Sequence, residues 1–337
     1  MKTRKILSVL LIFAITLTLF VSCEKKITVK YKQFWGFFGE SVVGTLYDYS
    51  GMAKDDFDTL AKTVEEKLAA YHRLFDIYNE YDGIVNLKTL NDNAGGGPMK
   101  VDGAIIELLS FAKTMYDKTG GRLNVAMGAV LKIWHGCRES GDRIPDMEEL
   151  TRANAHTDIS DLIIDKENST VELRDPEMSL DVGAVAKGFS VEKVALWLEE
   201  EGYSSLVLDV GGNLRAIGEK PDGGGWNAGI RDPFSPFSDS TVYSLSIKDE
   251  ALVTSGSYFN FYTVGGVRYH HIINNETLMP ENYYISVSIK APSSAMADAL
   301  STAIFNMPKD EADEFIKSMD GIFVVFVMPD GKVVTSE

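Results

Sequence analysis

Hydrophobic residues recur every three or four positions in several stretches of the chain, which predicts amphipathic helices. The first stretch spans residues 55–78, and its apolar stripe consists of Phe57, Leu60, Ala61, Val64, Leu68 and Tyr71. Asp102 is a suitable N-cap for a second helix that continues to Tyr116. Residues 295–305 are apolar or small at almost every position. That pattern is typical of a helix buried on all sides.

The second half of the chain contains short apolar runs bounded by turn residues, which predict strands. These runs lie at residues 206–210, 243–247, 283–289 and 322–327, with a turn at 223–225 and an exposed loop at 233–240. Residues 136–160 are polar, and we expect them to form an exposed connection. Strands gathered apart from helices predict an α+β fold and not a doubly wound sheet. About 300 residues suit one large domain or two closely packed ones.

The first 22 residues have the pattern of a bacterial export signal. Lys2, Arg4 and Lys5 precede an apolar core from Ile6 to Phe20, and Val21-Ser22-Cys23 resembles a lipoprotein cleavage site. We therefore expect residues 1–22 to be removed and Cys23 to be lipidated, with residues 23–35 as a tether and residues 36–337 as the functional domain. This places the protein on the outer face of a bacterial cell membrane, periplasmic or extracellular. An ordinary secretory signal remains an alternative.

Charge and motif content exclude several classes of function. The chain carries 49 acidic against 33 basic residues, a net charge of −16, and such a field repels nucleic acid. If Cys23 is lipidated, Cys137 has no cysteine partner, so no intrachain disulfide can form. The sequence has no strand-linked GxGxxG, no GK[ST] phosphate loop, no CxxC pair and no HExxH. It therefore gives no support to dinucleotide-fold dehydrogenases, P-loop NTPases or zinc peptidases.

A turn rich in small residues runs from Asp181 to Gly188 and precedes a predicted helix. Gly183, Ala184 and Gly188 allow the backbone to approach a ligand closely, and a helix N-terminus attracts anions. Lys187 adds a mobile positive charge. Such a turn suits a phosphate or pyrophosphate with an oxygen-bound cation beside it. An ordinary strand-to-helix turn is an equally good interpretation of these residues alone.

The predicted buried helix at residues 295–305 contains a carboxylate. Asp298 and Thr302 are one turn apart, so they lie on the same face. A buried carboxylate needs a partner charge or a metal ion, and two oxygen ligands one turn apart suit Mg²⁺. Alternatively, Asp298 stands near the helix start and Thr302 bonds to a backbone carbonyl.

Two of the five histidines, His270 and His271, are adjacent. Neighbouring residues on a strand face opposite ways, so one of them can reach a site while the other packs elsewhere. A lone histidine is more often structural than catalytic.

Taken together and in order, these segments resemble the family of FAD:protein FMN transferases (the ApbE type) over residues 36–330. The matching segments are Gly44-Thr45, Tyr78, residues 120–128, Asp181 to Gly188, Asp209 to Asn213, Trp226 to Pro233, residues 254–258, His270 to Ile272 and the Asp298 helix. Each segment is weak alone, but the fixed order is specific. The resemblance implies an elongated α+β body with T-fold-like mixed or antiparallel sheets and packed helices.

The resemblance also implies an activity and a set of site residues. The activity is Mg²⁺-dependent transfer of FMN from FAD to a threonine or serine hydroxyl of an acceptor protein, with release of AMP. The acceptor would be a membrane redox-complex subunit or an exported flavoprotein. The implied Mg²⁺ ligands are Asp298, Thr302, the Ala184 carbonyl and Ser301. The implied FAD contacts are Val43, Tyr78, Leu123, Asn124, Val125, Asp181, Lys187 and Ile272.

For catalysis, His271 is the acceptor-side acid/base candidate, with His270 in reserve, beside Lys187 and Asp298 at the pyrophosphate. Two alternatives stay open. The same site with water admitted would make an FAD pyrophosphatase that yields FMN and AMP. A flavin-binding lipoprotein without catalysis would keep the pocket alone.

Overall fold

An antiparallel sheet of eight strands is the largest element of the computed structural model, which describes residues 28–39 and 42–336. Across the sheet, the order is β1 (Lys30–Trp35), β2 (Val43–Asp48), β6 (Ser205–Val210), β7 (Asn213–Gly218), β10 (Ala251–Gly256), β13 (Ser286–Ala291), β14 (Phe323–Val327) and β15 (Val333–Thr335). Strand β1 lies within the predicted tether, so the sheet begins before residue 36. The proposed lipidation site, Cys23, lies outside the described residues.

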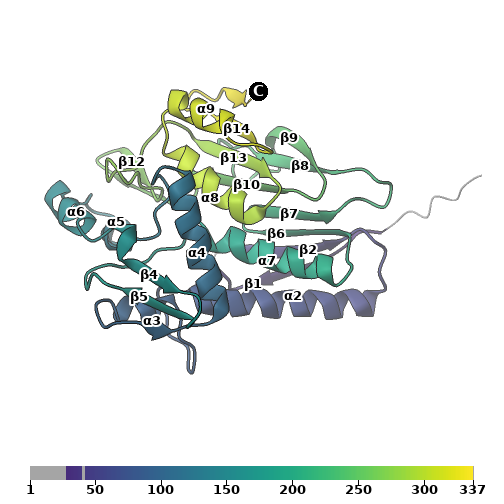
Figure 1. Cartoon of the computed structure of the whole chain (residues 1–337). Coiled ribbons are helices and arrows are strands. Elements are labelled where there is room, and N and C mark those ends of the chain that lie inside the picture. The colour runs from purple at the N-terminus through teal and green to yellow at the C-terminus, as the bar shows by residue number, and fades with distance from the viewer. Residues whose placement is uncertain (1–27, 40–41, 337) are drawn as a thin grey trace, which may run out of the picture.

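Three helices cover one face of this sheet: α2 (Lys54–Phe75), α7 (Ala186–Glu200) and α8 (Ser294–Phe305), as Figure 1 shows. Side chains alternate between the two faces of a strand. In β6, Leu206 and Leu208 therefore pack in the same cluster as α2 and α7, whereas Val207 packs in the cluster on the opposite face. That opposite face is covered by the hairpin of β8 (Trp226–Arg231) and β9 (Thr241–Ile247).

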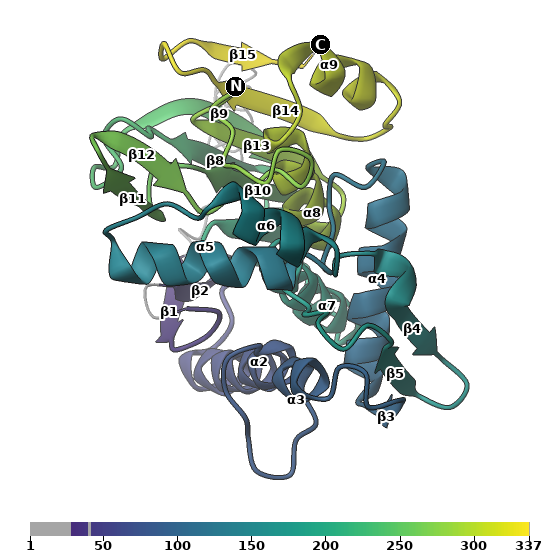
Figure 2. The same ribbon diagram turned by 90° about the vertical axis from the view of Figure 1, so that its left-hand side faces the viewer.

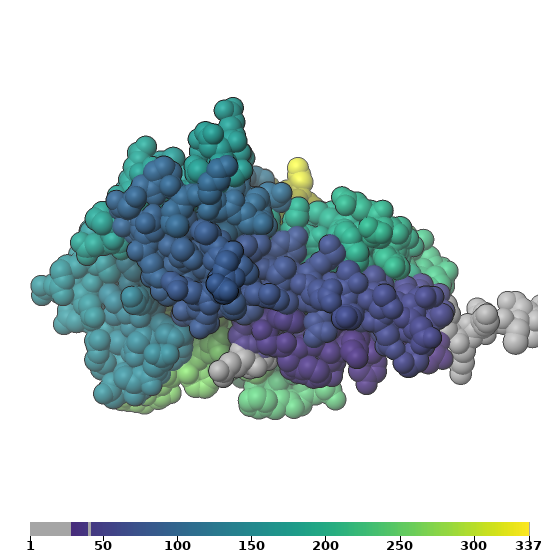
Figure 3. Space-filling view, turned by 90° about the horizontal axis from the view of Figure 1, so that it is seen from below, coloured from purple at the N-terminus to yellow at the C-terminus, as the bar shows by residue number. Residues whose placement is uncertain are grey.

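The rest of the chain builds a second layer around this body. Its elements are α3 (Leu87–Asp92), α4 (Gly103–Lys118), α5 (Gly128–Ser140), α6 (Met147–Asn154), α9 (Lys309–Lys317), the sheet β3 (Met99–Lys100), β5 (Thr170–Leu173) and β4 (Leu162–Asp165), and the hairpin β11 (Phe261–Val264) and β12 (Val267–His270). Helices α5 and α6 lie on the side facing the viewer in Figure 2. Seen from below, α2 and the segment after it cover much of the surface (Figure 3).

Most sequence-based expectations for the elements are confirmed, as is the α+β class with antiparallel sheets. Asp102 caps α4 by accepting the Ala104 N–H at 2.8 Å, and α8 is buried almost throughout. Helix α2 ends at Phe75, so Tyr78 lies in the following loop and not in the helix. Among the described residues, no helix has the length and apolar character needed to span a membrane.

One expectation is wrong. Residues 136–160 were expected to be an exposed connection, but they include the end of α5 and all of α6. Both helices are polar on the outside and bury only a few side chains, among them Trp134, Cys137 and Leu150. These residues pack against Tyr262 of β11 and Leu278, which are far away in sequence. Long-range packing of this kind stabilises helices whose own apolar stripe is short.

Helices α7 and α8 cross at Gly188, and the crossing leaves no room for a side chain. A Cβ atom at Gly188 would lie 2.4 Å from Asp298 Cβ and 2.5 Å from the Ser294 carbonyl oxygen. Both atoms are parts of α8 that cannot rotate away. Glycine is therefore required by the distance between the helices, and the crossing brings the backbone of α7 against Asp298.

We expect Gly188→Ala to lower the free energy of unfolding by about 1–3 kcal/mol, because an added methyl group must push two packed helices apart. The matched control is Gly136→Ala in α5, where an added Cβ meets no atom within 4 Å. That change should raise stability by up to about 1 kcal/mol, the helix propensity difference. Urea unfolding of both variants measures the contrast. Equal stability of the two variants would contradict the close crossing.

Candidate active site

The buried carboxylate of Asp298 is the centre of the candidate site. The residue is 4% exposed, and its Oδ2 accepts the Gly188 N–H at 2.8 Å. Its Oδ1 lies 3.8 Å from Lys187 Nζ. Desolvation raises the pKa of Asp298, while the charge of Lys187 and the Gly188 N–H oppose that rise. The turn and the α8 carboxylate singled out in the sequence thus meet across the α7–α8 crossing.

Asn213 joins this pair from the turn between β6 and β7. With the amide oriented to satisfy both neighbours, its nitrogen lies 3.2 Å from Asp298 Oδ1 and its oxygen 3.0 Å from Lys187 Nζ. The two-residue turn that delivers Asn213 has Gly211 and Gly212 at φ 58° and 86°, as a tight hairpin requires. Asn213 belongs to one of the matching segments, but the sequence did not predict a role for it. Its contacts with Lys187 and Asp298 are seen only in the folded structure.

Helix α7 begins at Ala186, with Val185 as its N-cap, so Ala184 lies just before the helix. The Gly188 N–H is one of the first N–H groups of the helix, which have no partner within it. Here it bonds to the Asp298 carboxylate, and no hydrogen bond within the described part of the chain reaches the Ala184 oxygen. A carbonyl oxygen without a donor is a suitable ligand for a hard cation.

Three hydroxyl groups lie beside Asp298 on α8 and β10. Ser301 Oγ donates to the Asp298 carbonyl at 2.9 Å, and it lies 2.7 Å from Ser255 Oγ. Thr302 Oγ1 lies 3.2 Å from the same Ser255 oxygen. Ser301 is completely buried, whereas Thr302 is partly exposed. Thr302 is therefore the better placed of the two predicted ligands. Ser255 belongs to the matching segment 254–258, but the sequence assigned it no role.

The two adjacent histidines differ in their surroundings. His270 is 2% exposed, and both ring nitrogens are engaged, with the Glu281 carbonyl at 2.8 Å and the Ile272 N–H at 3.2 Å. Its ring packs edge-on against Phe305. His271 is exposed to solvent, and its Nδ1 lies 3.2 Å from the Asn260 carbonyl. A carbonyl can only accept a hydrogen bond, so Nδ1 carries the proton and Nε2 keeps its lone pair.

His271 is held in its neutral form. Although its side chain is open to solvent, the protein surrounds it on most sides, and desolvation lowers its pKa to about 4. The positive charges of Arg138 and Lys187 act in the same direction, and the Asn260 carbonyl opposes them. At neutral pH, Nε2 of His271 is therefore available to accept a proton.

Tyr78 and Asp181 form a second part of the site together with α5. The side chain of Tyr78 is 60% exposed, and its ring lies 5.5 Å from the His135 ring at 35°. Desolvation raises the pKa of Asp181, while the Gly183 N–H and the charge of Arg138 oppose the rise. Neither His135 nor Arg138 was predicted as a site residue. Arg138 lies in the segment 136–160 that was interpreted as a connection, and His135 directly precedes it.

Several residues that were predicted to contact FAD have side chains that are buried or bonded away from the site around Asp298. Leu123, Val125 and Ile272 are buried in the core. The Asn124 side chain bonds to the Thr157 carbonyl and to the Ala126 N–H, both at 2.9 Å. Val43 begins β2, and its carbonyl accepts the Gly211 N–H at 3.0 Å, which places it beside the turn that carries Asn213.

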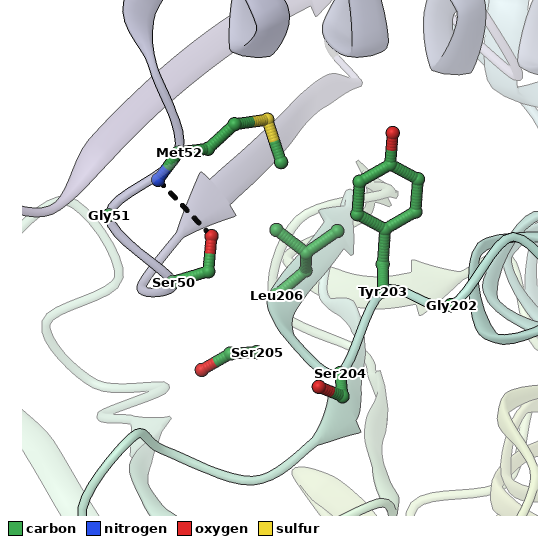
Figure 4. A pocket seen from close by; sticks show the side chains of 8 residues that line it. All are labelled: Ser50, Gly51, Met52, Gly202, Tyr203, Ser204, Ser205 and Leu206. Atoms are coloured by element: carbon green, nitrogen blue, oxygen red, sulfur yellow. Dashed lines mark hydrogen bonds between the residues drawn. The ribbon is translucent and has the colours of Figure 1, made fainter.

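Two surface cavities of about 380 and 390 Å³ lie elsewhere. The first is lined by Ser50, Gly51, Met52 and residues 202–206, and no charged side chain lines it (Figure 4). The second is lined by eight residues that include Asn124 and Asn275. Neither includes Asp298, Lys187 or His271, so the paired charges and not these cavities define the candidate site.

The residues present fit a hard cation with few protein ligands. Within the ranges that the structure covers, no three His, Cys, Asp or Glu side chains are grouped as a metal cluster. The ligands of this site therefore do not suit zinc or other metals that need several such side chains. A single carboxylate, a carbonyl without a donor and a hydroxyl match Mg²⁺, which retains water and substrate oxygens in its remaining positions.

Comparison with known proteins shows the family of the chain. A sequence model described as the ApbE family matches residues 39–326. A protein named FAD:protein FMN transferase from Treponema pallidum (strain Nichols) is 33% identical over 316 residues, covering 87% of this chain and 84% of that protein. A protein of the same name from Escherichia coli (strain K12) is 25% identical over 276 residues, covering 81% of this chain and 77% of that protein.

Solved structures show the same fold. The apbe protein from Thermotoga maritima is 27% identical and has a TM-score of 0.79, covering 91% of this chain and 97% of that one. The apo form of the flavinyl transferase ApbE from Pseudomonas stutzeri has a TM-score of 0.75 at 23% identity, covering 92% and 94%.

Proposed function

The chain belongs to the ApbE family, and from this premise we propose that it is a flavin transferase that moves FMN from FAD to an acceptor protein. The relatives named FAD:protein FMN transferase support this activity. The observation that carries the proposal is the buried Asp298 carboxylate, which accepts the Gly188 N–H at the start of α7 and lies 3.8 Å from Lys187 Nζ.

We further propose that the enzyme requires Mg²⁺, that the acceptor group is a threonine or serine hydroxyl, and that AMP is released. Asp298, the Ala184 carbonyl and Thr302 would hold the metal ion, with Ser301 buried behind them. Mg²⁺ bound there would neutralise charge on the diphosphate oxygens.

The chain's own groups divide the remaining work. Lys187 binds and orients the diphosphate, and Tyr78 offers an exposed ring for stacking against the flavin or the adenine. His271 Nε2 accepts the proton of the acceptor hydroxyl. The hydroxyl oxygen then forms a bond to the FMN phosphorus, the phosphoanhydride bond breaks, and AMP leaves with the bonding electron pair.

Hydrolysis of FAD to FMN and AMP is the second candidate. His271 is exposed, so water can reach the same Nε2 atom that would serve a protein hydroxyl. A flavin-binding role without catalysis is less well supported, since Lys187, Asp298 and Thr302 are all present beside the site. An incubation with FAD, Mg²⁺ and an acceptor domain separates the three functions. It yields an FMN-sized mass gain on the acceptor, free FMN, or neither.

For location, we propose a lipid anchor at Cys23 and an extracytoplasmic position on the bacterial membrane. The basic, apolar and cysteine segments at the N-terminus support this proposal. The acceptor would then be another exported or membrane-bound protein, such as a redox-complex subunit.

We expect Asp298→Asn to lower transfer by at least about 10²–10³, because the amide keeps the volume of the carboxylate but removes its charge from the proposed metal site. Chelation of Mg²⁺ should have the same effect on the unmodified protein. Titration calorimetry with Mg²⁺ should show weakened binding in the variant. Full activity of either preparation at saturating FAD would remove Asp298 from the mechanism.

Lys187→Ala should reduce transfer and hydrolysis together, by roughly 10²–10³, because both reactions break the same phosphoanhydride. His271→Ala should reduce transfer more than hydrolysis, since water needs less alignment than a protein hydroxyl. The lowered pKa of His271, about 4, keeps it neutral above pH 5, so kcat/KM for transfer should stay constant down to about pH 5 and fall near pH 4. A fall centred near pH 6.5 would contradict this assignment.

If Cys23 is lipidated, the full-length protein should partition with membranes. Cys23→Ser should release it or leave the N-terminal segment uncleaved, and mass spectrometry of the N-terminal peptide reads the outcome directly. The matched control is Cys137→Ser, because Cys137 is buried in the core and should not affect partitioning. A soluble protein cleaved elsewhere would indicate ordinary secretion.

A further inference from the structure

Helix α5 carries an arginine without a carboxylate partner in the described structure. Arg138 is half-buried, and no ion pair joins it to the acidic residues of the described ranges. By comparison, Arg143 lies just beyond the same helix and pairs with Glu149 at 3.2 Å. A half-buried cation that lacks a paired anion, in a protein of net charge −16, needs a structural or functional reason.

A chain of hydrogen bonds fixes the direction of the Arg138 side chain. One guanidinium nitrogen lies 2.8 Å from His135 Nδ1, and His135 Nε2 lies 3.1 Å from Glu139. Guanidinium can only donate, so His135 accepts at Nδ1 and donates at Nε2 to the carboxylate. Glu139 thus orients His135, and His135 orients Arg138. The other N–H groups of the guanidinium stay available for a ligand.

The start of α5 is attached to the turn that carries Asp181. The Gly128 N–H donates to the Ser179 carbonyl at 2.9 Å, and the Asp181 N–H donates to the Val125 carbonyl at 2.8 Å. A Cβ at position 128 would lie 2.3 Å from that Ser179 oxygen, so the approach depends on glycine. Farther along the helix, His135 packs beside the exposed Tyr78 ring. Helix α5 therefore forms one side of the candidate site.

The charge of Arg138 reaches the groups that define the site. It opposes the rise in the pKa of Tyr78 and Asp181, and it contributes to the lowered pKa of His271. Lys187 also acts on His271. Two cations from different helices thus lie within electrostatic range of the same histidine. A guanidinium presents parallel N–H groups that match two phosphate oxygens, which a lysine cannot do.

We propose that Arg138 contacts the diphosphate of FAD as a second cationic group, in addition to Lys187, and that His135 positions it. This inference rests on the proposed function, because it takes FAD as the ligand. If the inference holds, Arg138 distinguishes flavins with phosphate from flavins without it. Its guanidinium would have no phosphate oxygen to contact in a flavin such as riboflavin.

The test compares Arg138→Gln with Arg138→Lys and with the control Arg143→Gln. Dissociation constants for FAD and for riboflavin are measured by titration calorimetry on the purified chain, with chelator present so that no metal contributes. We expect Arg138→Gln to weaken FAD binding about tenfold, equivalent to about 1.4 kcal/mol, and to leave riboflavin binding within about twofold. Arg138→Lys should recover part of the loss, and Arg143→Gln should match the unmodified protein.

Two results would overturn the inference: unchanged FAD binding in Arg138→Gln, or an equal loss for FAD and riboflavin, which would assign Arg138 to packing. Urea unfolding of each variant checks that it is folded, and Arg138→Lys provides the second comparison if the glutamine variant is not. Competition with AMP and FMN then identifies the contacted phosphate. Failure of the unmodified protein to bind FAD even when Mg²⁺ is present would reject the proposed function and this inference with it. Normal FAD binding by both proteins rejects the inference alone.

Discussion

The close crossing of α7 and α8 at Gly188 is the constraint on which the site depends. It brings the Gly188 N–H, one of the first N–H groups of α7 that have no partner within the helix, within 2.8 Å of the Asp298 carboxylate. This contact stabilises a buried negative charge. A carboxylate in this position without a partner would be driven to its neutral form. Lys187, from the same turn, supplies the opposing charge.

A buried ionic network fixes the elements that make this crossing. Arg215 of β7 is 3% exposed and lies 3.5 Å from Glu192, 2.9 Å from Glu199 and 3.0 Å from Asp249. Glu192 of α7 in turn accepts the Ser294 N–H at the start of α8, at 2.6 Å. Buried ion pairs contribute little net stability because desolvation offsets the attraction, but they penalise other arrangements strongly. The network accordingly holds α7, α8 and β7 in one relative position.

Local patterns in the sequence were sufficient for the parts of the structure that depend on local physics. The period of α2, the Asp102 cap and the apolar character of α8 are properties of single segments, and the carboxylate at Asp298 stood out because its surroundings are apolar. Arg138 and Asn213 were missed as site residues for the opposite reason. Their roles depend on Lys187 and Asp298 for Asn213, and on Tyr78, Asp181 and His271 for Arg138, all of which are distant in sequence, and neither periodicity nor spacing encodes such proximity. Helix α6 was not predicted because it buries one leucine, Leu150, and a single apolar position does not form the repeating pattern that predicts a helix.

The electrostatics of the site connect ligand binding to proton transfer. Desolvation and, to a smaller extent, the charges of Arg138 and Lys187 oppose protonation of His271, so in the absence of a ligand the histidine is a weak base. A diphosphate bound to those two cations would neutralise their field at the ring. By Coulomb's law, the pKa of His271 would then rise, while desolvation, the largest cause of its lowered pKa, would stay in place. The acceptor hydroxyl would therefore meet a stronger base when FAD is in place than when the site is empty. Arg138 and Lys187, which would bind FAD, would thereby also control when His271 can accept a proton.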